Sequence, residues 1–236
     1  MPTTTIYATT NTTGRGIIHV SNNDWDDAVT ATTGTVDTNT SNNFAVRAGA
    51  ISGRGGTSYR VWRSFAYFNL SSITTTMTAA TVKVYGAGSV NNGGTMSMYL
   101  SSAFNNNGTA LASTDFDNVS STLYSANSYN ELTWNKSGLN SFSLNAVAIT
   151  AVNSNKYLNV CFRNQLEVDE EAPEDDNYLG INFQSSGTNR IQVEVTHAAA
   201  GYSNTVNSVT SANYEKINNV AKSGIERINY TPIPPP

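Results

Sequence analysis

The chain has 236 residues, of which 39% are apolar and only 13% are charged. Its 13 basic residues are scattered among 17 acidic ones, for a net charge of −4, so nothing resembles the basic stripe of a nucleic-acid-binding protein. Cys161 is the only cysteine, which excludes an internal disulfide framework. No signal-peptide pattern follows Met1 and no apolar run approaches the ~20 residues of a membrane span, so we expect synthesis in a cytoplasm and no membrane partner.

Apolar and polar residues alternate with a period of two along much of the chain, between turns rich in Gly and Asn. The alternation predicts strands over 43–49, 62–70, 80–84, 96–100, 132–134, 158–162, 179–183 and 191–195. This spacing of strands and turns favours an antiparallel all-β sandwich over a fold of βαβ units. The stretch 145–152 is apolar without alternation, which predicts a short helix over one end of the sandwich. The body is expected to span residues 1–200, followed by an extended tail over 201–236.

Three aspartates, Asp24, Asp26 and Asp27, flank Trp25 near the N-terminus. Such a cluster is typical of a turn in which Asp side chains accept hydrogen bonds from backbone N–H groups. A cation held beside the sandwich is the alternative.

Aromatic residues on the 62–70 strand divide between its two faces. Trp62 shares a face with Phe68 and Leu70, which predicts core packing. Phe65 and Tyr67 point the other way, and in a two-sheet sandwich that face meets solvent or a neighbour. Together with Tyr59 they are candidates for a subunit contact, or for a glycan platform, because aromatic planes suit the C–H faces of sugars.

The run from Glu167 to Asp176 is the only dense charge cluster. A hard cation such as Ca²⁺ would relieve the repulsion between its carboxylates. The candidate ligands are Asp169, Glu170, Glu171, Glu174, Asp175 and Asp176. The spacing fits no EF-hand, which favours the other interpretation, a solvated loop that keeps the surface soluble.

Catalysis finds little support in the sequence. His19 and His197 lie at opposite ends of the body and outside any recognisable motif. Cys161 alternates with apolar residues and is expected to be inert. We therefore expect a protein that is not an enzyme and needs no cofactor.

Several segments together resemble the DNRLRE-type β-sandwich domain, over about Tyr7 to His197. The similar segments are RSFAYFNLSSI at 63–73, MTAATVKV at 77–84, FSLNAV at 142–147, FQSS at 183–186 and RIQVEV at 190–195. The chain departs from the family pattern at Asn69, where Asp is usual, and at Ile191, where Pro is usual. The resemblance implies a jelly-roll sandwich of the kind used as a carbohydrate-binding or adhesive module. It brings no catalytic residues.

An eleven-residue repeat follows the body, reading VNSVTSANYEK, INNVAKSGIER and a truncated INY from 206 to 230. A unit this short cannot bury its apolar positions alone, so these must pack on the body, on copies of the chain, or on another protein. The predicted anchor positions are Val206, Val209, Tyr214, Ile217, Val220, Ile225 and Ile228. A helical seam of eleven-residue period and stacked β-arcs are both open, and the Asn, Ser and β-branched residues slightly favour β-arcs.

The repeat resembles the "V-N-G-V-x-x-A-x-I-x-K" repeats of predicted structural proteins of tailed phages, with Ser208 and Asn219 at the Gly position. Together the two resemblances imply a virion protein: a capsid decoration, or a short head or tail fibre, made in the host cytoplasm. Its expected partners are further copies of itself and capsid, portal or tail components. The alternative is a tail-fibre or adhesin module that binds a host-surface glycan.

Overall fold

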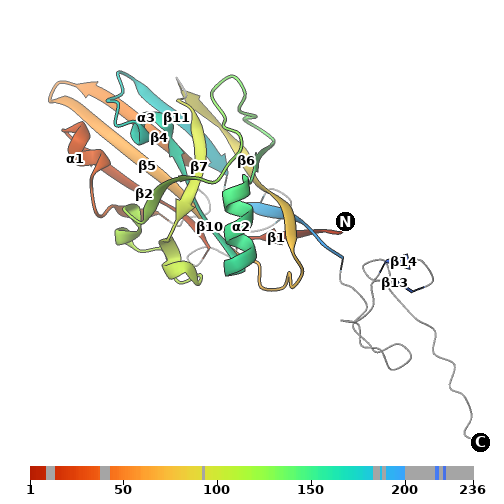
Figure 1. Ribbon diagram of the computed structural model, residues 1–236. Helices are drawn as coiled ribbons and strands as arrows, with labels where there is room; N and C mark the ends of the chain where they lie inside the picture. The colour runs from red at the N-terminus through yellow and green to blue at the C-terminus, as the bar shows by residue number, and fades with distance from the viewer. Residues whose placement is uncertain are drawn as a thin grey trace, which may run out of the picture.

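The fold is an antiparallel all-β sandwich with a few short helices, which confirms the fold class expected from the sequence (Figure 1). The computed structural model describes residues 1–8, 14–37, 43–91, 94–182, 187, 190–199, 216–217 and 220–221. Among the described residues, none of the helices is long and apolar enough to cross a membrane.

Twelve strands of the described body join one continuous sheet, which folds into two facing layers. One layer has the order β1-β12-β6-β11-β4, and the other has β5-β10-β7-β8 with β2 beside β5; β9 pairs with β6, and β3 with β2. The strands are β1 (Thr3–Tyr7), β2 (Arg15–Asn22), β3 (Thr35–Asp37), β4 (Asn43–Gly53), β5 (Gly56–Asn69), β6 (Met77–Asn91), β7 (Met96–Ser101), β8 (Val119–Leu123), β9 (Leu139–Ser143), β10 (Tyr157–Asn164), β11 (Asp176–Asn182) and β12 (Gln192–His197).

Strand β5 joins the two layers because it is long enough to have three partners. One of its edges pairs with β2 from Tyr59 to Ala66. Its other edge pairs first with β4, up to Trp62, and then with β10 from Ser64 onward. The β4–β5 hairpin closes at Gly53 and Gly56, and Gly56 has φ = +112°, a conformation that favours glycine.

The inner core lies between the two layers. Its side chains come from β2, β5, β7 and β10 on one side and from β4, β6, β11 and β12 on the other, and include Phe68, Val82, Val160, Ile181 and Val193. Phe68 and Leu70 are fully buried, and the partly buried Trp62 packs against the same cluster, as the strand pattern predicts. Each large apolar side chain buried here contributes about 1.5–3 kcal/mol.

A second cluster, the outer core, covers the opposite face of β5 and β10. Phe65, Tyr67 and Cys161 pack there under three short helices, α1 (Trp25–Val29), η1 (Ala103–Asn106) and η2 (Ser113–Phe116). Phe65 is 0% exposed and Tyr67 is 6% exposed, so the expectation that they face solvent or a neighbouring subunit is wrong. Alternation identifies residues that share a face, but it does not show which distant segments fold over that face. Tyr59 is half-buried at the edge of this core, with its ring 5.8 Å from that of Trp25.

The predicted helix near residue 145 is confirmed as α2 (Ala146–Asn155), which packs against β6 and β10. Asn145 caps its N-terminus, because its side chain accepts a hydrogen bond from the N–H of Ala148 at 3.0 Å. Lys156 ends the helix in a left-handed conformation with φ = 57°.

The predicted strand over 132–134 is wrong, because Leu132 and Thr133 lie in a turn that ends just before Trp134. The Asn130 side-chain oxygen accepts hydrogen bonds from the backbone N–H groups of Leu132 and Thr133, both at 3.1 Å. An Asn side chain that bonds the backbone in this way competes with strand pairing. Leu132 is therefore 92% exposed, whereas Trp134 is buried in the inner core.

Two short pieces of the repeat are described, β13 (Lys216–Ile217) and β14 (Val220–Ala221). They pair antiparallel, with Ile217 opposite Val220, so these four residues agree with the β geometry rather than the helical one. The remaining anchor candidates, Val206, Val209, Tyr214, Ile225 and Ile228, lie outside the described residues. The division between body and tail stays a prediction.

Candidate functional site

The acidic run does not gather into a cation site. Asp176 begins β11 and forms a two-pronged ion pair with Arg47, whose Nε and Nη2 each lie 2.5 Å from one carboxylate oxygen. Asp169 accepts a hydrogen bond from the Gln165 side chain at 2.8 Å. In the described part of the chain, no three His, Cys, Asp or Glu side chains are placed to hold a metal ion.

The rest of the run lies at the surface around a tight turn. Glu170 has φ = 57°, and its backbone carbonyl accepts a hydrogen bond from Trp25 Nε1 at 3.1 Å. This bond ties the acidic run to α1. The exposed carboxylates of the run are Asp169, Glu170, Glu171, Glu174 and Asp175. They agree with the solvated loop that the sequence favours over a calcium site.

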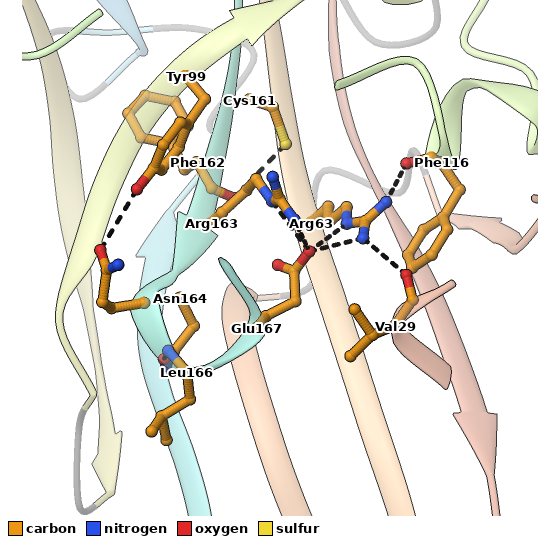
Figure 2. Close-up of polar contacts among 11 residues, drawn as sticks. Val29, Arg63, Tyr99, Phe116, Cys161, Phe162, Arg163, Asn164, Leu166 and Glu167 are labelled. Carbon is orange, nitrogen blue, oxygen red and sulfur yellow. Dashed lines mark hydrogen bonds and ion pairs between the residues drawn. The ribbon is translucent and has the colours of Figure 1, made fainter. Parts of the chain in front are cut away.

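The first residue of that run, Glu167, belongs instead to a buried ion network (Figure 2). Here the Glu167 cluster means Glu167 together with Arg63 and Arg163. One carboxylate oxygen, Oε1, lies 2.7 Å from Nε and 2.6 Å from Nη2 of Arg63, and 2.9 and 2.6 Å from the same atoms of Arg163. Glu167 is 0% exposed, and it lies in the short helix α3 (Gln165–Val168) next to Arg163 at the end of β10.

Arg63 connects the sheet to two segments of the covering layer. Its Nη2 donates to the carbonyl of Val29 at the end of α1, at 3.1 Å, and its Nη1 donates to the carbonyl of Phe116 at the end of η2. Its guanidinium carbon lies 3.9 Å from the centre of the Phe116 ring. One side chain of β5 therefore joins α1, η2 and α3 to the sheet.

The cluster holds one carboxylate against two guanidiniums, and their proximity determines the ionisation of Glu167. Burial alone would raise the pKa of Glu167, but the adjacent guanidiniums of Arg63 and Arg163 lower it below its ordinary value, so the carboxylate stays ionised. Burial strongly raises the pKa of the neighbouring Cys161 thiol, so the thiol stays protonated and unreactive.

A small cleft of about 340 Å³ opens beside this cluster, lined in part by Glu167, Arg163 and Ser121. The second carboxylate oxygen of Glu167, Oε2, is buried without a hydrogen-bond partner. Two positive and three negative side chains line the cleft, because Asp117 and Glu170 are also present. This mixed lining favours neither an anion nor a cation.

The aspartates near the N-terminus lie at the start of helix α1, and one of them caps it. Asp24 precedes α1, and its carboxylate accepts a hydrogen bond from the N–H of Asp27 at 3.2 Å. Asp26 and Asp27 lie in the first helical turn, where negative charge is favourable. The prediction that these side chains serve the backbone is confirmed for Asp24.

A second hollow in the described body is a polar cleft of about 460 Å³. It lies where β7 and β10 meet the end of α2 and the segment after η2. Five carboxylate and amide side chains line it: Asn106, Asp117, Asn118, Asn155 and Asn159. Tyr124 and Tyr157 add two aromatic rings, and serine hydroxyls line the remainder with a few aliphatic side chains.

Asn159 fixes the floor of the polar cleft. Its Nδ2 donates to the carbonyl of Ala103 and, at 3.0 Å, to Oδ1 of Asn106. Because the carbonyl can only accept, the orientation of the amide is determined. The Asn159 Oδ1 is thereby left buried without a partner, which costs about 1–3 kcal/mol.

The backbone around Asn106 is strained. Phe104, Asn105 and Asn106 are three consecutive non-glycine residues in the left-handed region, with φ of 56°, 50° and 56°. Each such residue costs on the order of 1–3 kcal/mol unless its surroundings enforce it, and such residues gather at ligand-binding sites. Here the buried Phe104 ring enforces the turn, which brings Asn106 to the rim of the polar cleft.

The histidines do not meet. His19 lies in β2 with its ring 5.4 Å from that of Trp62, and burial lowers its pKa. His197 ends β12, where its ring nitrogens lie 3.0 Å from the Thr4 hydroxyl and 2.9 Å from the Thr75 hydroxyl. His197 thus joins the first and last strands of the body.

The sequence offered weak signals for the polar cleft. Asn159 follows strand alternation on the same face as Cys161, and a polar residue at such a position is one signal that it serves a site. The run Asn105-Asn106-Asn107 is another, because Asn tolerates the left-handed region. Neither signal shows that β10, α2 and β8 meet at one hollow.

The arrangement of strands and cores defines the chain as an antiparallel β-sandwich protein with an added outer layer. A comparison with known protein families finds no family model that matches the chain, and a comparison with curated proteins finds no relative.

Proposed function

We propose that this chain is a structural accessory protein of a phage virion, attached through its C-terminal tail with the sandwich facing outward. The observation that carries the proposal is the eleven-residue repeat over 206–230, whose apolar positions recur in register after a complete sandwich. Apolar positions at a fixed period outside a domain core are typical of an assembly element. The pairing of Ile217 opposite Val220 places two of them in one short antiparallel ladder.

The mechanism of attachment follows from this pattern. Burial of the apolar tail positions between copies, or against a capsid, portal or tail component, would supply the binding free energy, together with backbone pairing between chains. The body already buries its own large apolar residues in two cores. In this proposal the attachment is therefore assigned to the tail, and the body points outward.

The test is the mass in solution of the full chain and of a 1–201 truncation, measured by light scattering. We expect a multimer for the full chain and a folded monomer for the truncation. Ile217→Asp should weaken the multimer, whereas Ser211→Asp, the same charge change at a polar position of the repeat, should not. A truncation that fails to fold, or that retains the full multimer, would contradict attachment through the tail.

A second candidate function is saccharide binding by the body, as in a tail-fibre tip or adhesin. The polar cleft favours it, because amides, one carboxylate and two tyrosines converge on one hollow. The predicted platform of Phe65, Tyr67 and Tyr59 does not support it, since Phe65 and Tyr67 are buried under the outer layer. The two functions are compatible, because one uses the tail and the other the body.

A further inference from the structure

The polar cleft has the size and shape of a small-molecule site. Its volume of about 460 Å³ falls within the range of roughly 300–1,000 Å³ typical of ligand pockets. It is open at the surface, and its walls come from β7, β10, α2 and the segment that runs from η2 into β8. Two strands and a helix supply three of these walls, and regular elements hold side chains in place more precisely than loops do.

The charge of the lining excludes an anionic ligand. None of the described residues that line the cleft is Lys, Arg or His, and Asp117 is a carboxylate on its wall. Carboxylated, sulfated or phosphorylated ligands would meet that carboxylate with no cation in the lining of this cleft to offset it. A cation is equally disfavoured, because a single carboxylate among neutral amides is a poor ligand set for one.

The lining instead suits adjacent hydroxyl groups. A carboxylate accepts hydrogen bonds from two neighbouring hydroxyls, and an amide can donate to one hydroxyl while accepting from the next. Asp117 and Asn155 are exposed at the rim, where such groups can reach a ligand. At the floor, Asn159 Oδ1 is buried without a hydrogen-bond partner, so a ligand hydroxyl would satisfy it only after a small shift of the side chains that cover it.

Tyr157 supplies a fixed aromatic wall. Its ring stacks on that of Tyr67, with centroids 5.9 Å apart and planes at 29°. Tyr67 is itself held in the outer core, so the Tyr157 ring keeps its orientation. An aromatic face beside hydroxyl-binding groups matches the C–H face of a pyranose.

We propose that the polar cleft binds a neutral sugar of one or two units, with Asp117 and Asn155 on its hydroxyls, Tyr157 against its ring and Asn159 at the floor. This inference rests on the second of the two proposed functions, and it adds the place of the site and the class of sugar. The left-handed turn at Asn105 and Asn106 is then the strained backbone that holds Asn106 against Asn159.

The experiment is saturation-transfer NMR on the full chain with the methyl glycosides of glucose, galactose, mannose and N-acetylglucosamine, and with methyl glucuronide as the charged match. We expect saturation transfer to at least one neutral glycoside and at least tenfold weaker binding of the glucuronide. A tenfold difference corresponds to a repulsion of about 1.4 kcal/mol between the glucuronide carboxylate and Asp117. Asn155→Ala should weaken binding about tenfold, as the loss of one hydrogen bond predicts.

Two matched variants keep the result specific. Ser154→Ala changes an exposed neighbour of Asn155 outside the lining, and Glu174→Gln removes an exposed carboxylate outside the cleft; both should bind as the unchanged chain does. Binding of the glucuronide alone, or binding that Asn155→Ala and Asp117→Ala leave unchanged, would overturn the inference while leaving saccharide binding in place. No transfer to any of the five glycosides would overturn both.

Discussion

The two faces of strand β5 are equally buried but are built in different ways. On the inner face, Phe68 and its neighbours meet side chains from regular strands of the facing layer. On the outer face, Phe65 and its neighbours pack against short helices and turns. Hydrogen bonds and ion pairs of the Glu167 cluster hold these segments in place. A regular strand layer buries apolar residues by repeating its pattern, whereas an irregular layer needs individual polar contacts to fix its place.

The same truncation, Phe to Ala, should lower the free energy of unfolding by different amounts on the two faces of β5. Phe68→Ala should lower the free energy of unfolding by about 4 kcal/mol, because the strands around it cannot close the cavity. Phe65→Ala should cost less, about 3 kcal/mol, because the turns above it can collapse into the space. Both side chains are 0% exposed, so burial does not distinguish them. Urea unfolding measures both values, and an equal or larger loss for Phe65→Ala would remove the distinction.

Removing the carboxylate of the Glu167 cluster should loosen the outer layer in particular. Glu167→Ala leaves two buried guanidiniums without their carboxylate, and we expect the free energy of unfolding to fall by about 3 kcal/mol. This value is at the lower end for a broken buried ion pair, because the adjacent cleft admits water. Amide hydrogen exchange should speed up in α1, η2 and α3 while β6 and β12 keep their protection.

Glu174→Gln is the matched control, because it changes an exposed carboxylate of the same acidic run and should stay within about 0.5 kcal/mol. If the Glu167→Ala variant lost protection equally across its whole body, the outer layer and the strand layers would unfold as one unit. That result would contradict the separate fastening of the outer layer by the Glu167 cluster.

Acid should act on the same carboxylate. The folded-state pKa of Glu167 is lowered from its ordinary value of 4.5. Its contribution to stability is therefore fully present above about pH 4.5 and is lost as the pH falls through the folded-state value. A plot of unfolding free energy against pH should fall below pH 4.5 more steeply for the unchanged chain than for Glu167→Gln. Parallel curves for the two proteins would assign the acid sensitivity to other groups.

The sequence predicted the inner face better than the outer one, for a physical reason. Alternation in β5, β7 and β10 is a local property, so it predicts these strands and the side chains that share the inner face with Phe68. Whether Phe65 and Tyr67 met water depended on segments around residues 28, 104 and 116, which are distant in sequence and carry no period. The acidic run likewise gives no sign that Glu167 is buried, because charge density along the chain does not show that Arg63 lies across from it.

The same limit applies to the polar cleft and to the turn at 130–133. Asn159 and Asn155 are near in sequence, but Asp117 joins them only through the pairing of β8 with β7. At the turn, one side-chain acceptor on Asn130 outweighs the strand propensity of the residues that follow. Sequence patterns predict regular elements well, and they predict single side-chain contacts poorly.

The smallest expected effect concerns the start of α1, within the outer layer. Asp24→Ala removes the capping hydrogen bond to the N–H of Asp27 and should lower the free energy of unfolding by about 1 kcal/mol. Asp26→Ala removes the same charge from the first turn without a capping bond, and should cost about 0.3 kcal/mol. The difference between the two, measured by urea unfolding, isolates the cap from the charge. Arg63 also bonds the last carbonyl of α1, at Val29. If this bond is what mainly holds the helix, amide hydrogen exchange in Asp24→Ala will rise only in the first turn of α1. Exchange that rises as far as Val29 would show that the cap, and not the Glu167 cluster, determines the position of the helix.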